Sequence, residues 1–426
     1  MNILFPFMNS MNKESISVKD IARISKYKKK ILFLAFLALS MNLRAPITAL
    51  PPVVGTLRDN FEISAGTVGL LTSIPVLCFG ILTVPIGIIM KRFSVETSVF
   101  ATLFGIIVGS IVRSSGGLTM ALIGTIIIGV ALTVGNIAGL MVIGRDYKSH
   151  LSVMTGVYVS GMSIGAMVTT ALTAPFAEWI GWRMSLVFSA EIAFATAVLW
   201  GYAASLTKLE KSVVERIKPG AIRETKAEGA TLNEVGFGSL RKKPIIWLLA
   251  AAFAAHTFIF YGMTAWLPDY LTEVLKMTDS QAGYAASLFQ ILGLLGCFGI
   301  PFLASTKRFS NNALFAVVTV SWTIMPVGIM LFPSLWLLWI IFGAIGSGGG
   351  FTVIFSLVMR HASNLDENRM MSAFVQSVGY IFASASPVVV GQIYHITENW
   401  NYCFLMLTAT AVFMAFCGMY ASREKK

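Results

Sequence analysis

Charged residues are scarce in this sequence. Asp, Glu, Lys and Arg make up 12% of its 426 residues, whereas a soluble domain carries about 25%. So few charges cannot cover a water-facing surface of this size, and 56% of the residues are hydrophobic. A soluble enzyme, a disordered scaffold and a coiled coil are therefore excluded. The composition indicates a polytopic membrane protein.

Residue patterns that support catalysis or metal binding are missing as well. The four cysteines lack the C-x-x-C spacing of a redox or zinc site and lie inside apolar runs. We expect them to act as small packing residues. The sequence has no nucleophile–base pair, metal-ligand cluster or Walker motif, so we expect no catalysis, no cofactor and no metal. The cysteines are Cys78, Cys297, Cys403 and Cys417.

The N-terminus lacks the pattern of a cleaved secretory signal. Met1 to Met8 is apolar but has no basic start, and no small-residue cleavage site follows. Seven basic residues lie between Lys13 and Lys30. Ile21, Ile24 and Tyr27 recur at helical spacing, which predicts a short surface helix there.

Apolar runs of roughly 20 residues, the length that spans a bilayer, recur along the chain. We expect twelve helices, at residues 31–54, 65–90, 95–113, 118–144, 151–174, 183–204, 245–268, 281–305, 310–332, 335–359, 371–393 and 400–421. The polar stretch 205–244 separates six helices from six. The predicted division is a segment 1–30, a half 31–204, a linker 205–244, a half 245–421 and a tail 422–426.

Lysine and arginine are distributed unevenly over the connections. If the N-terminus is cytoplasmic, 27 of the 32 basic residues lie on the cytoplasmic side. Arg58, Arg113, Arg183 and Lys276 lie on the other side, and Arg44 lies inside the first span. Cytoplasmic loops of membrane proteins carry such an excess. We therefore expect both termini and the linker in the cytoplasm, and we do not read the net charge of +12 as a sign of a nucleic-acid partner.

Sequence features repeat between the two halves at an offset of 216 residues. Pro85 precedes Lys91-Arg92-Phe93-Ser94, and Pro301 precedes Lys307-Arg308-Phe309-Ser310 at the same spacing. Six spans are an even number, so both copies have the same orientation. Parallel six-helix halves are the arrangement of the major facilitator fold, whose substrate site lies between the halves. The sequence predicts an all-α membrane protein with this fold and twelve transmembrane helices.

The loops after the second and eighth spans resemble the superfamily motif G-x-x-x-D-R-x-G-R-R. Gly87 and Arg92 match this motif, but Lys91 stands where the motif has Asp. The usual acidic partner is therefore missing. By their position, Lys91, Arg92, Lys307 and Arg308 are candidate gating residues.

Arg44 is the most informative single residue. It lies about 13 residues, or roughly 20 Å, into the first span. A cation near the bilayer centre costs at least about 2.5–3.5 kcal/mol, so Arg44 should face a cavity and an anion. Its forked donors suit small anions and planar nitro or carboxylate groups. A protein carboxylate is the alternative partner, but the eight predicted inner spans contain no Asp or Glu.

Further candidates surround this position in the sequence or lie on other inner spans. Asn42 is a candidate substrate contact, and the prolines Pro46, Pro51 and Pro52 should bend the first span. The remaining candidate contacts could instead join helices by hydrogen bonds. They are Tyr261, His256, Tyr158, Gln290, Gln376, Tyr380 and Asn136. A glycine-rich tenth span predicts close helix approach, at Gly343, Gly346, Gly348, Gly349 and Gly350.

Two titratable residues at membrane depth are candidates for proton coupling. His256 lies near the middle of the seventh span and titrates near neutral pH when exposed. Glu191 is the one carboxylate well inside a predicted span. The alternatives are a neutral histidine bonded to a neighbouring helix and a protonated or locally paired glutamate.

The segment Asn42-Leu43-Arg44-Ala45-Pro46-Ile47-Thr48 resembles the Asn-Leu-Arg-x-Pro-x-Thr opening of the cyanate/2-nitroimidazole transporter family. This family is a bacterial branch of the major facilitator superfamily. The resemblance continues through residues 69–77 and Gly181-Trp182-Arg183. It implies a transporter of the bacterial inner membrane. Members take up cyanate or export nitroimidazole, so the resemblance leaves substrate and direction open.

We therefore expect a secondary active transporter, not an enzyme. It would move a small anionic or polar planar solute, such as cyanate or a nitro or carboxylate compound, by alternating access. The expected partners are this solute, the lipid bilayer and, as a candidate coupling ion, the proton; we expect a monomer. The alternative is a drug or nitroimidazole efflux pump. The arginine in the first span, where exporters of cationic drugs often carry Asp, favours the first hypothesis.

Overall fold

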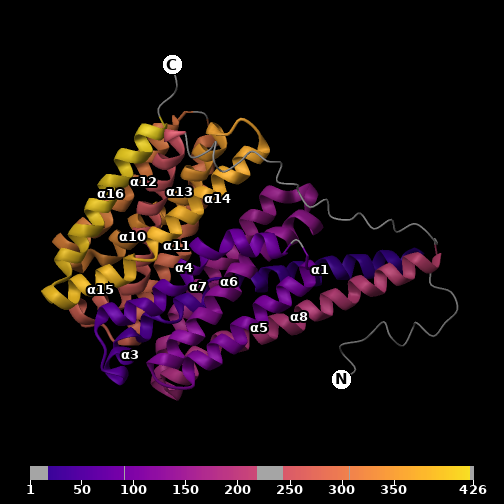
Figure 1. The fold of residues 1–426 in the computed structure, drawn as a ribbon, viewed down its shortest axis with the longest axis horizontal. Coiled ribbons are helices and arrows are strands. Elements are labelled where there is room, and N and C mark those ends of the chain that lie inside the picture. Colours follow the sequence, from indigo (N-terminus) through magenta and orange to yellow (C-terminus); the bar gives the residue numbers. More distant parts are fainter. Residues whose placement is uncertain (1–17, 91, 218–242, 307, 423–426) are drawn as a thin grey trace.

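The computed structural model describes residues 18–90, 92–217, 243–306 and 308–422 (Figure 1). Residues 1–17, most of the predicted linker (218–242), the tail 423–426, Lys91 and Lys307 lie outside the described residues. Within the described part, twelve helical stretches are long and apolar enough to cross a membrane. The predicted all-helical, twelve-span architecture is confirmed.

The N-terminal half runs from α1 to α8. Its elements are α1 (Val18–Asn42), α2 (Ala45–Thr48), the 3-10 turn η2 (Pro51–Val53), α3 (Val54–Phe61), α4 (Ala65–Met90), α5 (Val95–Ser114), α6 (Leu118–Asp146), η3 (Lys148–His150), α7 (Leu151–Ile180) and α8 (Trp182–Ile217). Helix α8 extends beyond residue 204, into the stretch predicted as linker. The predicted surface helix is continuous with the first span, because α1 begins at Val18.

The C-terminal half runs from α10 to α16. Its elements are α10 (Pro244–Leu275), α11 (Asp279–Ser305), α12 (Asn311–Leu331), η4 (Pro333–Leu335), α13 (Trp336–His361), α14 (Leu365–Ala383), α15 (Ser386–Thr397) and α16 (Trp400–Ser422). The eleventh span, predicted as one helix over 371–393, consists of α14 and α15. It breaks at Ser384 and Ala385, just before Pro387 in the first turn of α15.

The first span is broken where its prolines stand. It divides into α1, α2, η2 and α3, with Pro46 in the first turn of α2 and Pro51 and Pro52 in η2. Proline has no backbone N–H and its ring clashes with the preceding helical turn, so three prolines within seven residues strongly disfavour a continuous helix here. The predicted bend is confirmed, and Arg44 lies in the break.

Glycines let helices within the C-terminal half approach closely. A Cβ at Gly348 of α13 would lie 1.8 Å from the carbonyl oxygen of Gly293 on α11, and one at Gly296 would lie 2.1 Å from the carbonyl oxygen of Ile345. A larger residue would force the two backbones apart at such a crossing. The close approach predicted for the tenth span is confirmed.

The two halves meet most closely at one end. An even number of spans brings Val18 and Ser422 to the same side of the membrane, here called the terminal side. Figure 1 shows the halves converging near α3 and α15, away from that side, and diverging toward it. At the convergent end, a Cβ at Gly69 of α4 would lie 2.6 Å from the carbonyl oxygen of Pro387. The halves are therefore in backbone contact on the side opposite the termini.

Candidate functional site

Arg44 lies between the two halves, in the break of the first span. It precedes α2, with φ −119° and ψ −24°, and its side chain is half-buried. Its guanidinium carbon lies 5.1 Å from the ring centroid of Phe260, on α10 of the other half. No hydrogen bond or ion pair joins this guanidinium to another described residue. The cation rests on an aromatic face while its edge donors stay unused.

Several predicted contact residues lie within the electrostatic range of Arg44. The charge of Arg44 acts electrostatically on Tyr158 of α7, Tyr261 of α10 and Tyr380 of α14. The same charge also acts electrostatically on His256 and Cys297. These residues come from both halves. The break in the first span therefore places the cation at their junction.

Aromatic rings connect the halves beside this cation. The ring of Tyr380 lies 5.7 Å from that of Phe79 on α4 and 6.5 Å from that of Tyr261. Phe260 packs edge-on against Tyr261, with ring centroids 5.2 Å apart. Flat apolar surfaces thus lie next to the free donors of Arg44, an arrangement that suits a planar polar solute.

Other predicted contact residues are joined to neighbouring helices. The Tyr158 hydroxyl donates to Asn136 Oδ1 on α6 at 3.1 Å, and the Gln290 amide donates to Thr264 Oγ1 at 3.4 Å. Gln376 is half-buried on α14 and makes no hydrogen bond through its side chain to another described residue. Of these, Gln376 is the one whose amide stays available to a solute.

The side chain of Asn42 is engaged within the N-terminal half. Its side chain is fully buried, and its amide donates to Thr196 Oγ1 on α8 at 2.9 Å and to the Ala38 carbonyl oxygen. The hydrogen bond to Thr196 joins α1 to α8 inside the N-terminal half. We therefore leave Asn42 out of the proposed site.

The two proton-coupling candidates differ in their surroundings. His256 is buried, and its Nδ1 accepts a hydrogen bond of 2.9 Å from Trp322 Nε1 on α12. This bond requires a neutral ring nitrogen at Nδ1. Glu191 is exposed on α8, on the same face as the exposed apolar residues Met184 and Val198. Neither geometry places a free titratable group beside Arg44.

The two candidate gating residues that the structure describes, Arg92 and Arg308, lie at the terminal side. Arg92 and Arg308 are exposed in the loops after α4 and α11, and their partners in the predicted set, Lys91 and Lys307, lie outside the described residues. Nearby, Arg145 at the end of α6 forms ion pairs with Glu96 of α5 and with Asp146. The gating role stays a prediction.

Sequence reasoning missed two charged residues whose side chains the structure buries in the helical bundle. Arg113, predicted to lie on the outer side of the third span, is only 1% exposed. Asp269 lies one residue beyond the predicted end of the seventh span, yet α10 continues to Leu275. Its carboxylate faces Arg58 of the other half, with Arg58 Nη1 3.9 Å from Asp269 Oδ2. Single-sequence hydropathy places helix ends too coarsely to assign such residues.

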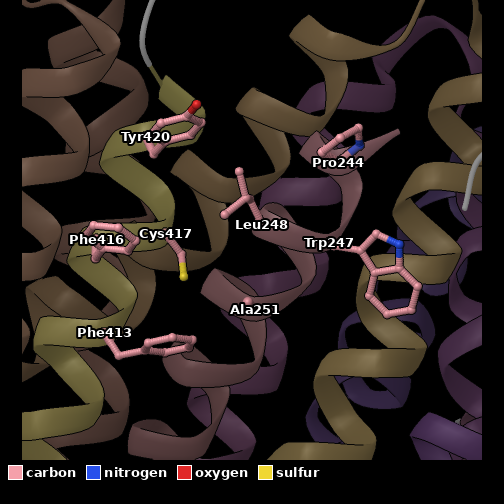
Figure 2. Close-up of a pocket in the computed structure, with 8 residues that line it drawn as sticks. All are labelled: Pro244, Trp247, Leu248, Ala251, Phe413, Phe416, Cys417 and Tyr420. Atoms are coloured by element: carbon pink, nitrogen blue, oxygen red, sulfur yellow. The ribbon is translucent and has the colours of Figure 1, made fainter. Parts of the chain in front are cut away.

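A pocket of about 750 Å³ lies elsewhere, between the terminal-side ends of α10 and α16 (Figure 2). Phe413, Phe416 and Tyr420 on its α16 wall are exposed. The lining is almost entirely apolar and contains no charged side chain. We therefore do not place a polar solute there. Its lining residues are Pro244, Trp247, Leu248, Ala251, Phe413, Phe416, Cys417 and Tyr420.

Comparison with known proteins identifies the family. A sequence model described as Major Facilitator Superfamily matches residues 31–387. The chain belongs to the Major Facilitator Superfamily. It is accordingly a multi-pass membrane transporter rather than an enzyme.

Relatives within the Major Facilitator Superfamily match over nearly the whole chain. The chain is 26% identical to the transporter YycB of Bacillus subtilis, covering 93% of both chains. It is 24% identical to the 2-nitroimidazole transporter of Escherichia coli, over 95% of this chain and 98% of the relative. It is 23% identical to the cyanate transport protein CynX of Escherichia coli, over 87% and 91%. The resemblance inferred from the first span is confirmed at low identity.

A solved structure shows the same superfamily fold. A mutant form of the nucleoside transporter NupG superposes with a TM-score of 0.72 at 13% identity, covering 92% of this chain and 100% of the other. Identity at this level supports the fold alone.

Proposed function

We propose that this transporter moves a small anionic or polar planar solute, of the cyanate, nitro or carboxylate class, across the bacterial inner membrane. One observation carries the proposal. Arg44 holds a half-buried guanidinium between the halves that no described carboxylate neutralises. A cation at membrane depth is costly without an anionic partner. The solute would supply that partner, through the edge donors that the Phe260 contact leaves unused.

The aromatic surroundings narrow the proposed solute class. Phe260, Tyr261 and Tyr380 offer ring faces and edges beside the cation. A flat ligand could stack on these rings while its anionic or nitro group meets Arg44. The relatives named for 2-nitroimidazole and cyanate transport agree with such a ligand.

The contact between the halves at the end opposite the termini would correspond to one state of an alternating-access cycle. We place both termini in the cytoplasm because the basic residues are concentrated on the side of the membrane that holds the termini. In that orientation the halves are in contact at the outer end and the site faces inward. The inner-membrane location, the monomeric state and the cytoplasmic termini belong to the proposal.

Uptake of an anion would require coupling. An anion entering against −100 mV loses about 2.3 kcal/mol per charge, which excludes it roughly fiftyfold at equilibrium. A co-transported proton or an exchanged anion would offset this cost. Coupling through His256 would require the Trp322 bond to break, because that bond uses the Nδ1 lone pair.

A ligand-stabilisation experiment tests whether Arg44 binds the solute. The melting temperature of purified protein is measured with cyanate, small carboxylates and nitroimidazoles, for wild type, Arg44→Gln and the control Arg183→Gln. Arg183 is exposed and stacks on Trp182, so its loss removes the same charge away from the site. At least one compound should stabilise wild type and the control but not Arg44→Gln. Equal stabilisation of all three proteins would contradict the proposal.

A further inference from the structure

Arg113 is a buried cation that no described carboxylate neutralises. It lies near the end of α5, and its side chain is 1% exposed. Its Nε and Nη2 have no hydrogen-bond partner, and no ion pair involves it among the described residues. Its single described partner is the carbonyl oxygen of Pro46, to which Nη1 donates at 2.7 Å. A guanidinium in such surroundings is costly, so this one contact needs an explanation.

The Pro46 carbonyl oxygen accepts no hydrogen bond from its own helix because of the break in the first span. In a continuous helix the Leu50 amide would bond to this oxygen. Here the Leu50 amide donates to the Ile47 carbonyl instead. Because a buried carbonyl without a donor is unfavourable, the break needs a donor from another helix. Arg113 supplies it in charge-assisted form, which is stronger than a neutral hydrogen bond.

The backbone of Arg113 is itself fixed against the neighbouring helix. A Cβ at Gly124 of α6 would lie 2.2 Å from the Arg113 amide nitrogen and 2.5 Å from the Gly109 carbonyl oxygen. Helices α5 and α6 therefore meet backbone to backbone at this point. The donor thus extends from a rigid crossing rather than from a loop.

Helix α2 is held from a second direction by α7. The hydroxyls of Thr48 and Thr169 lie 2.9 Å apart, and Thr170 Oγ1 donates to the Thr48 carbonyl oxygen at 3.3 Å. Between these threonines and Arg113, the four-residue helix cannot shift without losing hydrogen bonds. Arg44 immediately precedes this helix, so its position depends on the same contacts.

We propose that Arg113 is a positioning residue for the transport site: it binds the freed Pro46 carbonyl and thereby fixes the backbone that presents Arg44 to the solute. This inference rests on the proposed role of Arg44. Arg113 does not touch the solute. It acts through the geometry of α2.

The first test measures the position of residue 44 without any solute. In a background with Cys78, Cys297, Cys403 and Cys417 replaced by alanine, Arg44→Cys is treated with a water-soluble thiol reagent. Adding Arg113→Met should change the modification rate by about tenfold or more, because the charge-assisted bond is lost. Adding the control Arg183→Met should leave the rate unchanged. An unchanged rate with Arg113→Met would overturn the inference.

The second test measures transport with Arg44 in place. Arg113→Met should raise KM about tenfold or more, and Arg113→Lys, which retains one charged donor, should restore part of the affinity. Identical losses in the two variants would indicate a packing role and overturn the inference. If Arg44→Ala transports normally, the proposed function fails. The modification rate of the thiol introduced by Arg44→Cys would still report whether Arg113 fixes the break.

Discussion

At the scale of single residues, the site depends on which charges lack partners. Arg44 and Arg113 both belong to the N-terminal half and have no described carboxylate partner, but their surroundings differ. Arg113 is fully buried against a backbone carbonyl, whereas Arg44 is half-buried and faces the other half across the Phe260 ring. The first geometry suits a structural cation, and the second suits a cation that binds a solute.

The contact between Arg44 and Phe260 gives a testable consequence at this scale. Replacing Phe260 with leucine keeps an apolar side chain but removes the aromatic face. A cation–π contact contributes about 0.5–2 kcal/mol, so KM should rise about 2- to 30-fold. The control Phe289→Leu changes a ring stacked on Phe260, 6.0 Å away, rather than the ring beneath the cation. Steady-state uptake should separate the two variants; equal KM values would refute a role for the ring face.

The sequence located Arg44 but not Arg113 or Asp269, for a physical reason. Hydropathy identifies a cation in the middle of an apolar run, because few other residues there are charged. It cannot tell whether a charged residue at the end of a run continues the helix inward or enters a loop. Arg113 was the last residue of the predicted third span. Asp269 directly follows the last residue of the predicted seventh span. Their assignment depends on the carbonyl and the arginine that they meet in three dimensions.

At the scale of helices, proline and glycine decide where backbones break and where they touch. The prolines predicted a bend in the first span, which the structure shows as a break, and the glycines predicted close helix approach at the tenth span, which the structure shows between α11 and α13. The break between α14 and α15 was not predicted, although Pro387 stands just after it. The sequence does not show which of the prolines inside apolar runs only bend a helix. Pro75 and Pro85 lie within the unbroken α4.

The crossing of α11 and α13 can be tested by adding a single methyl group. Gly348→Ala would place a Cβ 1.8 Å from the Gly293 carbonyl oxygen, and overpacking of this kind costs about 1–3 kcal/mol. Gly299→Ala on α11 meets no atom within 4 Å and gains helix propensity of up to about 1 kcal/mol. Thermal unfolding in detergent should show a lower melting temperature for Gly348→Ala alone. A similar shift in both variants would argue against the tight crossing.

At the scale of the whole molecule, the halves are in close backbone contact at the end opposite the termini. The Gly69 approach to Pro387 is joined there by the Arg58–Asp269 pair. The Ser280 hydroxyl also donates to Glu178 of the other half at 2.7 Å. The long Arg58–Asp269 pair and the exposed Ser280–Glu178 hydrogen bond should each contribute little. The backbone contacts at Gly69 and at Gly391, where a Cβ would lie 2.7 Å from the Ala65 carbonyl oxygen, should therefore contribute most to holding this end closed.

Gly69→Ala should loosen this end. Its Cβ would overlap the Pro387 carbonyl oxygen, whereas Gly87→Ala on the same helix meets only a flexible side-chain atom at 3.9 Å. Ser73→Cys, at a buried position on α4, reports opening in the background without native cysteines. An impermeant maleimide added to intact cells should label it about fivefold faster or more in Gly69→Ala, and at the original rate in Gly87→Ala. If both variants label at the original rate, Gly69 does not hold the end closed.

The central claim is that Arg44 anchors the transported solute, and uptake into proteoliposomes tests it most directly. Wild type, Arg44→Ala and Arg183→Ala are reconstituted at equal, verified amounts, and counterflow of a labelled solute that stabilises the wild-type protein is measured. We expect counterflow by wild type and Arg183→Ala and none by Arg44→Ala, with all three proteins inserted. Counterflow by Arg44→Ala at the wild-type rate would contradict the claim.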